Sequence, residues 1–331
     1  MDSSVSALVA VVGPTGSGKS ELGLRIAEEF AGEIVNCDSL QVYRHFDIGT
    51  AKLSRQQQRG IPHHMIDVAD PGEPFTAGEY AARARPLLGE IAGRGHLPVV
   101  VGGTGFYLRA LIDGLFPGPG RDDSLRERLA GRQARRPGSL HRVLRRLDPA
   151  AAGTIHPNDV QKTIRAMEVI ILKRQPISAL YAQGRDALQG FRTLKIGLDP
   201  PRTELFGRLD ARCQKMFDMG LVEETRRILA MGYTPAAKPF ESHGYRQCVD
   251  FLEKRLTLEE ALRDARQNTR RYAKRQWTWF HHEKEVLWYA GFGDDPALQR
   301  RVLERVREFL ETGDSMPNSG FRRSYNQERS E

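Results

Sequence analysis

Short apolar runs alternate with amphipathic stretches over the first third of the chain. The runs at residues 7–12, 33–37 and 97–101 predict buried strands. Between them, residues 21–30 and 77–92 carry apolar side chains at helical spacing and predict helices. The order strand, helix, strand is typical of a parallel α/β sheet with flanking helices. We therefore expect an α/β core.

The middle of the chain departs from this alternation and becomes helical. Apolar spacing predicts helices over 106–112, 125–133, 140–147 and 162–173, with no strand until 191–198. The sequence Pro117-Gly118-Pro119-Gly120 cannot continue a helix and predicts a joint. We expect an all-α insertion domain at 119–190 within a discontinuous core made of 1–118 and 191–312.

The last third predicts more helices, at 204–219, 222–231, 245–253 and 258–279, which we expect to complete the core. Residues 313–331 are polar and predict a flexible tail. No apolar run is long enough to span a bilayer, and the first residues lack the basic region of a secretory signal. These features favour a cytoplasmic protein without membrane contact, and the absence of a long apolar seam favours a monomer.

Positive charge is concentrated in two segments. The chain has 50 Lys and Arg against 42 Asp and Glu, and residues 121–150 and 262–276 hold much of the excess. On the predicted last helix, Arg263, Arg266, Arg270 and Lys274 share one face. Such segments attract polyanions, because each neutralised phosphate releases counterions. The alternative is a pair of solvated, arginine-rich helices.

One motif carries a specific chemical prediction. Between the first predicted strand and helix stands Gly13-Pro14-Thr15-Gly16-Ser17-Gly18-Lys19-Ser20, which satisfies the P-loop pattern in its proper context. Its backbone N–H groups and Lys19 would hold phosphates, and the Ser20 hydroxyl would hold Mg²⁺. The motif predicts a P-loop NTPase-like core and nucleotide or diphosphate binding; it leaves open whether ATP binds and what is transferred.

The expected second acid of a P-loop hydrolase is missing. The later strand, 97–101, ends in Gly102-Gly103-Thr104 without a carboxylate. Asp38 does follow a strand, and carboxyl ends of parallel strands form the ligand crevice. Asp38 is therefore a candidate metal partner or proton acceptor, with a helix cap as the alternative.

Taken together, the motifs resemble those of the tRNA dimethylallyltransferase family. Beside the P-loop, the matching runs begin at Asp38-Ser39-Leu40-Gln41, His63-His64-Met65, Gly102-Gly103-Thr104-Gly105, His156-Pro157-Asn158-Asp159, Gly244-Tyr245-Arg246 and Ala273-Lys274-Arg275-Gln276. They follow the family's order and extend over about residues 7 to 290. A P-loop alone would predict none of the later runs.

The resemblance implies transfer of a dimethylallyl group from dimethylallyl diphosphate to N6 of the adenosine 3′-adjacent to the tRNA anticodon, with Mg²⁺. A P-loop and Mg²⁺ would stabilise the departing diphosphate, and a carboxylate would accept the proton of the amine. By similarity Asp38 is that base, Ser20 and Arg212 lie on the diphosphate and metal side, and Thr104 touches the target nucleotide.

The resemblance and the charge pattern together imply an RNA-binding surface for the anticodon stem-loop, whose target base must be extruded. The expected contacts are Asp38, Ser39, Leu40, Gln41, Thr104, Arg126, Gln161, Lys162, Thr163, Ile164, Arg165, Glu241, Ser242, His243, Gly244, Tyr245, Arg246, Arg266, Arg270 and Lys274. Tyr245 is a candidate for stacking on a base, with burial in the core as the alternative. Ser242-His243 depart from the more apolar pair of most family members, which leaves the contacts of that loop open.

Three other functions are compatible with parts of the sequence. A transferase acting on free adenine nucleotides explains the P-loop and Asp38 but not the arginine-rich insertion. A small-molecule kinase requires metal-orienting acids, and a non-catalytic RNA-binding protein has no use for Lys19, Ser20 and Asp38 together.

Overall fold

The computed structural model describes residues 5–312, which form two compact units. One unit is Ile112–Leu188, and the other is the rest of the described chain. The larger unit is built on a six-stranded sheet in the order β3-β2-β4-β1-β5-β6. Its strands are β1 (Ser6–Val12), β2 (Gly32–Asn36), β3 (His63–His64), β4 (Leu97–Val101), β5 (Phe191–Asp199) and β6 (Val286–Ala290).

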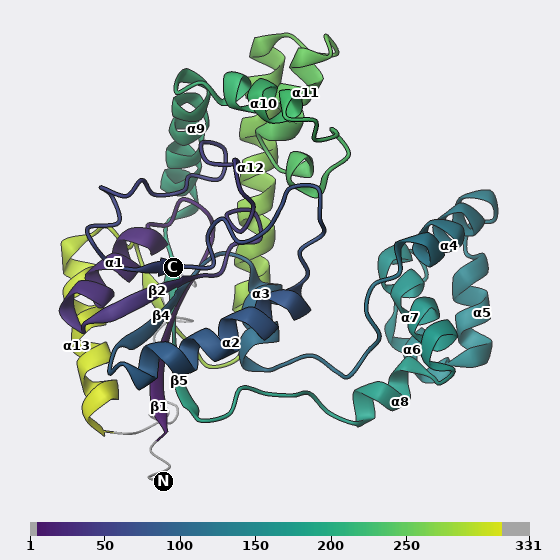
Figure 1. The fold of residues 1–331 in the computed structure, drawn as a ribbon, viewed down its shortest axis with the longest axis horizontal. Helices are drawn as coiled ribbons and strands as arrows, with labels where there is room; N and C mark the ends of the chain where they lie inside the picture. Colours follow the sequence, from purple (N-terminus) through teal and green to yellow (C-terminus); the bar gives the residue numbers. More distant parts are fainter. Residues whose placement is uncertain (1–4, 313–331) are drawn as a thin grey trace, which may run out of the picture. The chain divides into compact units, whose positions relative to one another are not determined.

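All paired strands of this sheet are parallel, so their carboxyl ends lie along one edge. Helices α1 (Lys19–Glu29) and α13 (Pro296–Thr312) pack on each other and against the sheet, as Figure 1 shows. Helix α2 (Ala77–Gly93) packs on β4 and is followed by α3 (Gly105–Ile112) after that strand. The apolar side chains of β1, β4 and β5 are almost fully buried, which is why their sequences read as continuous apolar runs.

Four helices extend the larger unit beyond the carboxyl ends of the strands (Figure 1). They are α9 (Arg202–Asp218), α10 (Leu221–Ala230), α11 (Tyr245–Leu252) and α12 (Leu258–His281), with a short 3-10 turn, η1 (Lys238–Glu241), before α11. Thr257 and Glu260 form a capping box that begins α12. Helix α12 packs along α9 and α11, so its side chains reach the strand ends.

The second unit is entirely helical. It contains α4 (Asp123–Arg135), α5 (Ser139–Leu147), α6 (Pro149–Thr154), α7 (Val160–Lys173) and α8 (Ile177–Ala182). Its own apolar core joins side chains of all five helices. Asp122, Asp148 and Asp159 begin α4, α6 and α7 by accepting hydrogen bonds from backbone N–H groups of the first turn.

The structure confirms the predicted class, a parallel sheet flanked by helices with a separate helical segment. The prediction that helices alone complete the core is wrong, because β6 adds an edge strand to the sheet. Helix α13, which packs on α1 and β5, was not among the predicted helices. The joint expected at residues 117–120 lies inside the helical unit, which begins at Ile112. The tail predicted at 313–331 lies outside the described residues. Within residues 5–312, none of the helices combines the length and the apolar character that a bilayer crossing requires.

Candidate active site

The P-loop turns sharply between β1 and α1, and three of its glycines have backbone angles that other residues rarely adopt. Gly13, Gly16 and Gly18 have φ of 142°, 80° and 85°. Gly18 also lies so close to Gly293 that an added Cβ would stand 2.7 Å from the Gly293 nitrogen. The Gly293 N–H donates to the Ser17 carbonyl at 2.8 Å. The loop therefore packs against the segment that follows β6. It also leads directly into the N-terminus of α1, where free backbone N–H groups favour a bound phosphate.

Lys19 and Ser20 open helix α1 at the end of the loop. The Lys19 ammonium donates to the Pro14 carbonyl at 2.7 Å, which folds the side chain back over the loop. Burial lowers the pKa of Lys19 to about 7; nearby Asp38 opposes this decrease and Arg212 adds to it. The Ser20 residue is exposed at the large cleft beside the loop.

Asp38 follows β2 by two residues and is held by its own turn. One carboxylate oxygen, Oδ1, accepts from the N–H of Leu40 at 2.9 Å and of Gln41 at 3.4 Å. Within the described part of the chain, Oδ2 has no hydrogen-bond donor from the protein, so it is available to a ligand. Both roles considered for Asp38 from the sequence are therefore compatible with the structure. Its Oδ1 accepts backbone hydrogen bonds of its own turn, and the residue also lines the cavities beside the P-loop.

Thr104 lies at the end of β4, the neighbour of β2, and is joined to the turn of Asp38. Its hydroxyl accepts from the Ser39 N–H at 2.9 Å and donates to the Ser39 hydroxyl at 3.3 Å. Gly102 packs so tightly that an added Cβ would stand 2.0 Å from the Cys37 carbonyl oxygen. The two strand ends therefore form one rigid surface that carries Asp38 and Thr104.

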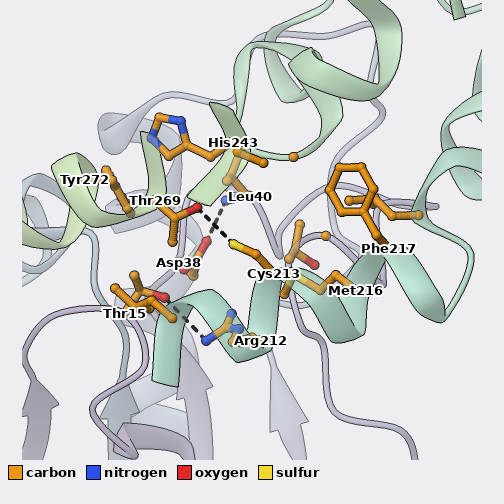
Figure 2. A pocket seen from close by; sticks show the side chains of 16 residues that line it. Thr15, Asp38, Leu40, Arg212, Cys213, Met216, Phe217, His243, Thr269 and Tyr272 are labelled. Carbon is orange, nitrogen blue, oxygen red and sulfur yellow. Dashed lines mark hydrogen bonds between the residues drawn. The ribbon is translucent and has the colours of Figure 1, made fainter. Parts of the chain in front are cut away.

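Arg212 reaches the site from α9. Its guanidinium donates to the Thr15 hydroxyl of the P-loop at 3.4 Å (Figure 2). Burial lowers the pKa of Arg212, and Asp38 acts in the opposite direction. The site thus contains three charged groups that influence one another: the cations Lys19 and Arg212 and the carboxylate of Asp38. All three line the cleft beside the P-loop.

Two cavities meet at these residues. The smaller one, with a volume of about 70 Å³, is lined mainly by apolar side chains of the loop after β2 and of α9, α10 and α12, including Leu40, Leu209, Met216, Phe217 and Leu221. Figure 2 shows Asp38, Thr15 and Arg212 together at this cavity. The other is a cleft of about 1360 Å³ that is lined by the P-loop residues Lys19 and Ser20. Both are lined by Thr15, Asp38 and Arg212, so the cleft at the P-loop adjoins the apolar cavity.

The loop before α11 differs from expectation at Tyr245. Its side chain is fully buried, its hydroxyl donates to Glu224, and it accepts from the Gly49 N–H at 3.1 Å. Of the two alternatives for Tyr245, the structure shows burial in the core, which leaves no exposed ring to stack on an RNA base. It instead holds the loop that contributes Gly49 and Thr50 to the apolar cavity.

The other residues predicted around Tyr245 are distributed differently. Glu241 and Arg246 are exposed, Ser242 and Gly244 are buried, and His243 lies in the wall of the apolar cavity against Tyr272. Burial lowers the pKa of His243 to about 4, so its imidazole is neutral at pH 7.

The basic face predicted on α12 is divided between two roles. Arg270 forms an ion pair with Asp210 of α9, and Arg266 donates to Gln214 of α9 at 2.7 Å. These two arginines therefore join helices. Lys274 is exposed, as is its neighbour Arg275, and both line a surface depression with Trp279.

In the helical unit, a fully buried carboxylate organises two of the predicted arginines. Glu168 accepts from Arg126 at 2.8 Å through both oxygens and from Arg165 at 2.6 Å. These bonds outweigh burial and hold the pKa of Glu168 at about 2. Gln161 and Lys162 are exposed, whereas Thr163 and Ile164 are buried, so their side chains are not available to RNA. The sequence analysis did not identify Glu168 as the residue that orients Arg126 and Arg165; its place one turn after Arg165 was the available signal.

This fold and site define an α/β protein of the P-loop class in which one carboxylate faces a phosphate loop across an apolar cavity. A family model described as IPP transferase matches residues 41–283. A tRNA dimethylallyltransferase of Solibacter usitatus is 61% identical over 303 residues, which cover 92% of this chain and 99% of that protein. One of Koribacter versatilis is 54% identical, with coverage of 91% and 98%.

Solved structures agree with these relatives. The tRNA isopentenylpyrophosphate transferase of Bacillus halodurans has a TM-score of 0.69 and 35% identity, over 93% of this chain and 97% of that chain. A eukaryotic dimethylallyltransferase captured while acting on tRNA has a TM-score of 0.79 and 27% identity, over 92% of this chain and 79% of that chain. The chain belongs to the IPP transferase family, which confirms the resemblance seen in its motifs.

Proposed function

We propose that this protein transfers a dimethylallyl group from dimethylallyl diphosphate to N6 of the adenosine 3′-adjacent to the anticodon in tRNA, releasing diphosphate. The observation that carries the proposal is that a P-loop cleft adjoins an apolar cavity at one unpaired carboxylate oxygen, that of Asp38. The names of the relatives, and the capture of one of them on tRNA, support it.

The donor fits the two adjoining cavities. Its diphosphate would lie at the N-terminus of α1 with the Lys19 ammonium and the Arg212 guanidinium, which stabilise the negative charge that grows as the C–O bond breaks. Its five-carbon chain would occupy the apolar cavity beside Leu209 and Met216. A diphosphate leaving group needs no positioned water, which accounts for the absence of an acid after β4.

Magnesium fits the diphosphate side of the site. Residues 5–312 contain no cluster of three His, Cys, Asp or Glu side chains arranged to hold a metal. The exposed Ser20 hydroxyl would hold Mg²⁺ beside the P-loop, with Asp38 as a second oxygen group in the same cleft, and Mg²⁺ typically combines few protein oxygens with phosphate oxygens and water. When bound, Mg²⁺ would neutralise diphosphate charge.

The acceptor is the exocyclic amine of adenosine. As the N6–C bond forms and the bond from carbon to the diphosphate oxygen breaks, N6 must lose a proton, and Asp38 would accept it at Oδ2, since Oδ1 already accepts from the Leu40 and Gln41 N–H groups. Thr104, fixed to the Asp38 turn through Ser39, would position the purine.

The RNA-binding surface would use the exposed cations. In the larger unit these are Lys274, Arg275 and Arg246, and in the helical unit Lys162 with the outward faces of Arg126 and Arg165. Arg266 and Arg270 would be less available to RNA, since each already bonds to α9.

The test is a product assay with three acceptors. The protein is mixed with Mg²⁺ and dimethylallyl diphosphate and with either tRNA, AMP or ATP, and the products are analysed by mass spectrometry. We expect prenylated tRNA alone. Prenylated AMP would establish a free-nucleotide enzyme, ATP turnover without RNA a kinase, and tRNA binding without product a non-catalytic protein.

A further inference from the structure

Gln276 joins the two loops that carry the proposed chemistry. Its side chain projects from α12 and is 6% exposed. Its Oε1 accepts from the Thr15 N–H of the P-loop at 2.8 Å, and its Nε2 donates to the Gly103 carbonyl at 2.8 Å. One amide therefore connects the end of β1 to the end of β4.

The two loops hold opposite partners of the reaction. The P-loop would hold the diphosphate of the donor, and the turn after β4 carries Thr104 against the Asp38 turn, where the purine would lie. Strands β1 and β4 are neighbours, with Val11 paired to Val101, but the loops leave the sheet beyond this pairing. Beyond the last strand pair, the side chain of Gln276 hydrogen-bonds to both loops and so connects them where the sheet has ended.

The bridge requires a primary amide. Thr15 presents a donor and Gly103 an acceptor, and a primary amide supplies one acceptor and one donor from a single planar group. A carboxylate at the same position would still accept from Thr15 but would place a negative oxygen against the Gly103 carbonyl. The fit is also close, because a Cβ on Gly103 would stand 2.3 Å from Gln276 Nε2.

The neighbours of Gln276 point to the same role. Tyr272, one turn earlier on α12, lines the apolar cavity and lies within hydrogen-bonding reach of Thr104 and Gln276. Lys274 and Arg275 project from the exposed side of the same turn. This turn of α12 thus carries cations on its exposed side and, on its buried side, the amide that joins the two loops.

We propose that Gln276 is a positioning residue that sets the distance between the diphosphate loop and the turn on which the target base lies. The inference rests on the proposed function and adds to it a group that contacts neither reactant. Loss of the bridge lets the loops separate, and a displacement of about 1 Å between reacting groups costs about 100-fold in rate.

The experiment compares Gln276→Glu, Gln276→Leu and the parent, with Gln267→Glu as the control at an exposed position of the same helix. We measure kcat and KM for dimethylallyl diphosphate at saturating tRNA, the Kd of tRNA, and the Kd of inorganic diphosphate with Mg²⁺. For Gln276→Glu we expect kcat to fall about 10- to 100-fold, with the Kd of tRNA within about twofold of the parent. For Gln276→Leu, which frees the Thr15 loop, we expect diphosphate to bind at least about fivefold more weakly. Gln267→Glu should match the parent.

Three results would overturn the inference: a kcat for Gln276→Glu within twofold of the parent, a loss of tRNA affinity as large as the loss of kcat, or thermal unfolding of both variants below the assay temperature. If the parent itself prenylated no tRNA, the proposed function would fail independently. The diphosphate titration would then decide the role of Gln276 in the loop, and an unchanged Kd in Gln276→Leu would refute it.

Discussion

The depressed pKa of Lys19 predicts a pH-dependent affinity for the diphosphate. Burial lowers this pKa to about 7 in the free protein, whereas a bound diphosphate supplies negative charge that keeps the ammonium protonated. Binding above pH 7 therefore requires proton uptake, and affinity decreases as the pH rises. At pH 9, two units above the pKa, about one molecule in 100 carries the proton, so Lys19 alone weakens binding about 100-fold between pH 6 and pH 9.

The assay is a calorimetric titration of inorganic diphosphate with Mg²⁺ at pH 6, 7, 8 and 9. The ligand titrates over the same range, so the informative quantity is the ratio of parent affinity to that of Lys19→Met, in which the ligand's own protonation cancels. We expect this ratio to decrease about 100-fold across the range. The control Lys215→Met removes an exposed lysine of the same cleft and should keep the parent's pH dependence. A ratio that stays constant from pH 6 to pH 9 would refute the reasoning, because Lys19 would then not change its protonation on binding.

Three further predictions concern the base, the helical unit and the RNA surface. Asp38→Asn should bind tRNA like the parent, but its single-turnover rate of prenylation should fall about 100-fold or more. The control Asp218→Asn, on the surface of α9, should keep the parent's rate. Equal rates for Asp38→Asn and the parent would remove Asp38 from the mechanism. Glu168→Gln should lower the free energy of unfolding by about 3 kcal/mol in urea. Because the pKa of Glu168 is depressed to about 2, its contribution is complete above about pH 4.5 and is lost as the pH falls through about 2; a pH-independent difference between variant and parent would contradict this. Lys274→Ala with Arg275→Ala should reduce the slope of log affinity for tRNA against log salt concentration by about two units. Arg266→Ala with Arg270→Ala should change this slope less and should instead destabilise the contact between α9 and α12. The reverse ranking of the two double variants in titrations at several salt concentrations would contradict the assignment.

The sequence predicted those elements whose own residues determine them. The apolar runs that became β1, β2, β4 and β5 were found because burial on both sheet faces leaves a local pattern, and most of the helices from α1 to α12 were found from the apolar spacing on one face. The six-residue helices α6 and α8 were missed, because each is too short to show that spacing clearly. The two-residue β3 is too short for any period, and β6 is only half buried at the sheet edge, so neither shows such a pattern.

The site divides in the same way. The P-loop and Asp38 were identified because a motif or a strand end marks them locally. The role of Tyr245 depends on a hydrogen bond to Glu224, 21 residues earlier, which the local sequence does not show. The neighbouring Arg246 suggested instead that the Tyr245 ring contacts RNA. Spacing placed Arg266 and Arg270 on one face of α12 but could not show that Asp210 and Gln214, at matching spacing on α9, would meet them. Gln276 carried no signal of its own role, because both of its partners are backbone groups remote in sequence.

The contact between Gly18 and Gly293 has a consequence for the order in which the protein matures during translation. The loop emerges from the ribosome among the first residues, yet the backbone on which it rests lies about 275 residues later, and Gln276 is almost as late. A nascent chain that ends before residue 276 lacks both supports, and one that ends between residues 277 and 292 still lacks the contact with Gly293. The P-loop therefore gains its full support only near the end of synthesis, and shortened translation products would carry a P-loop without it.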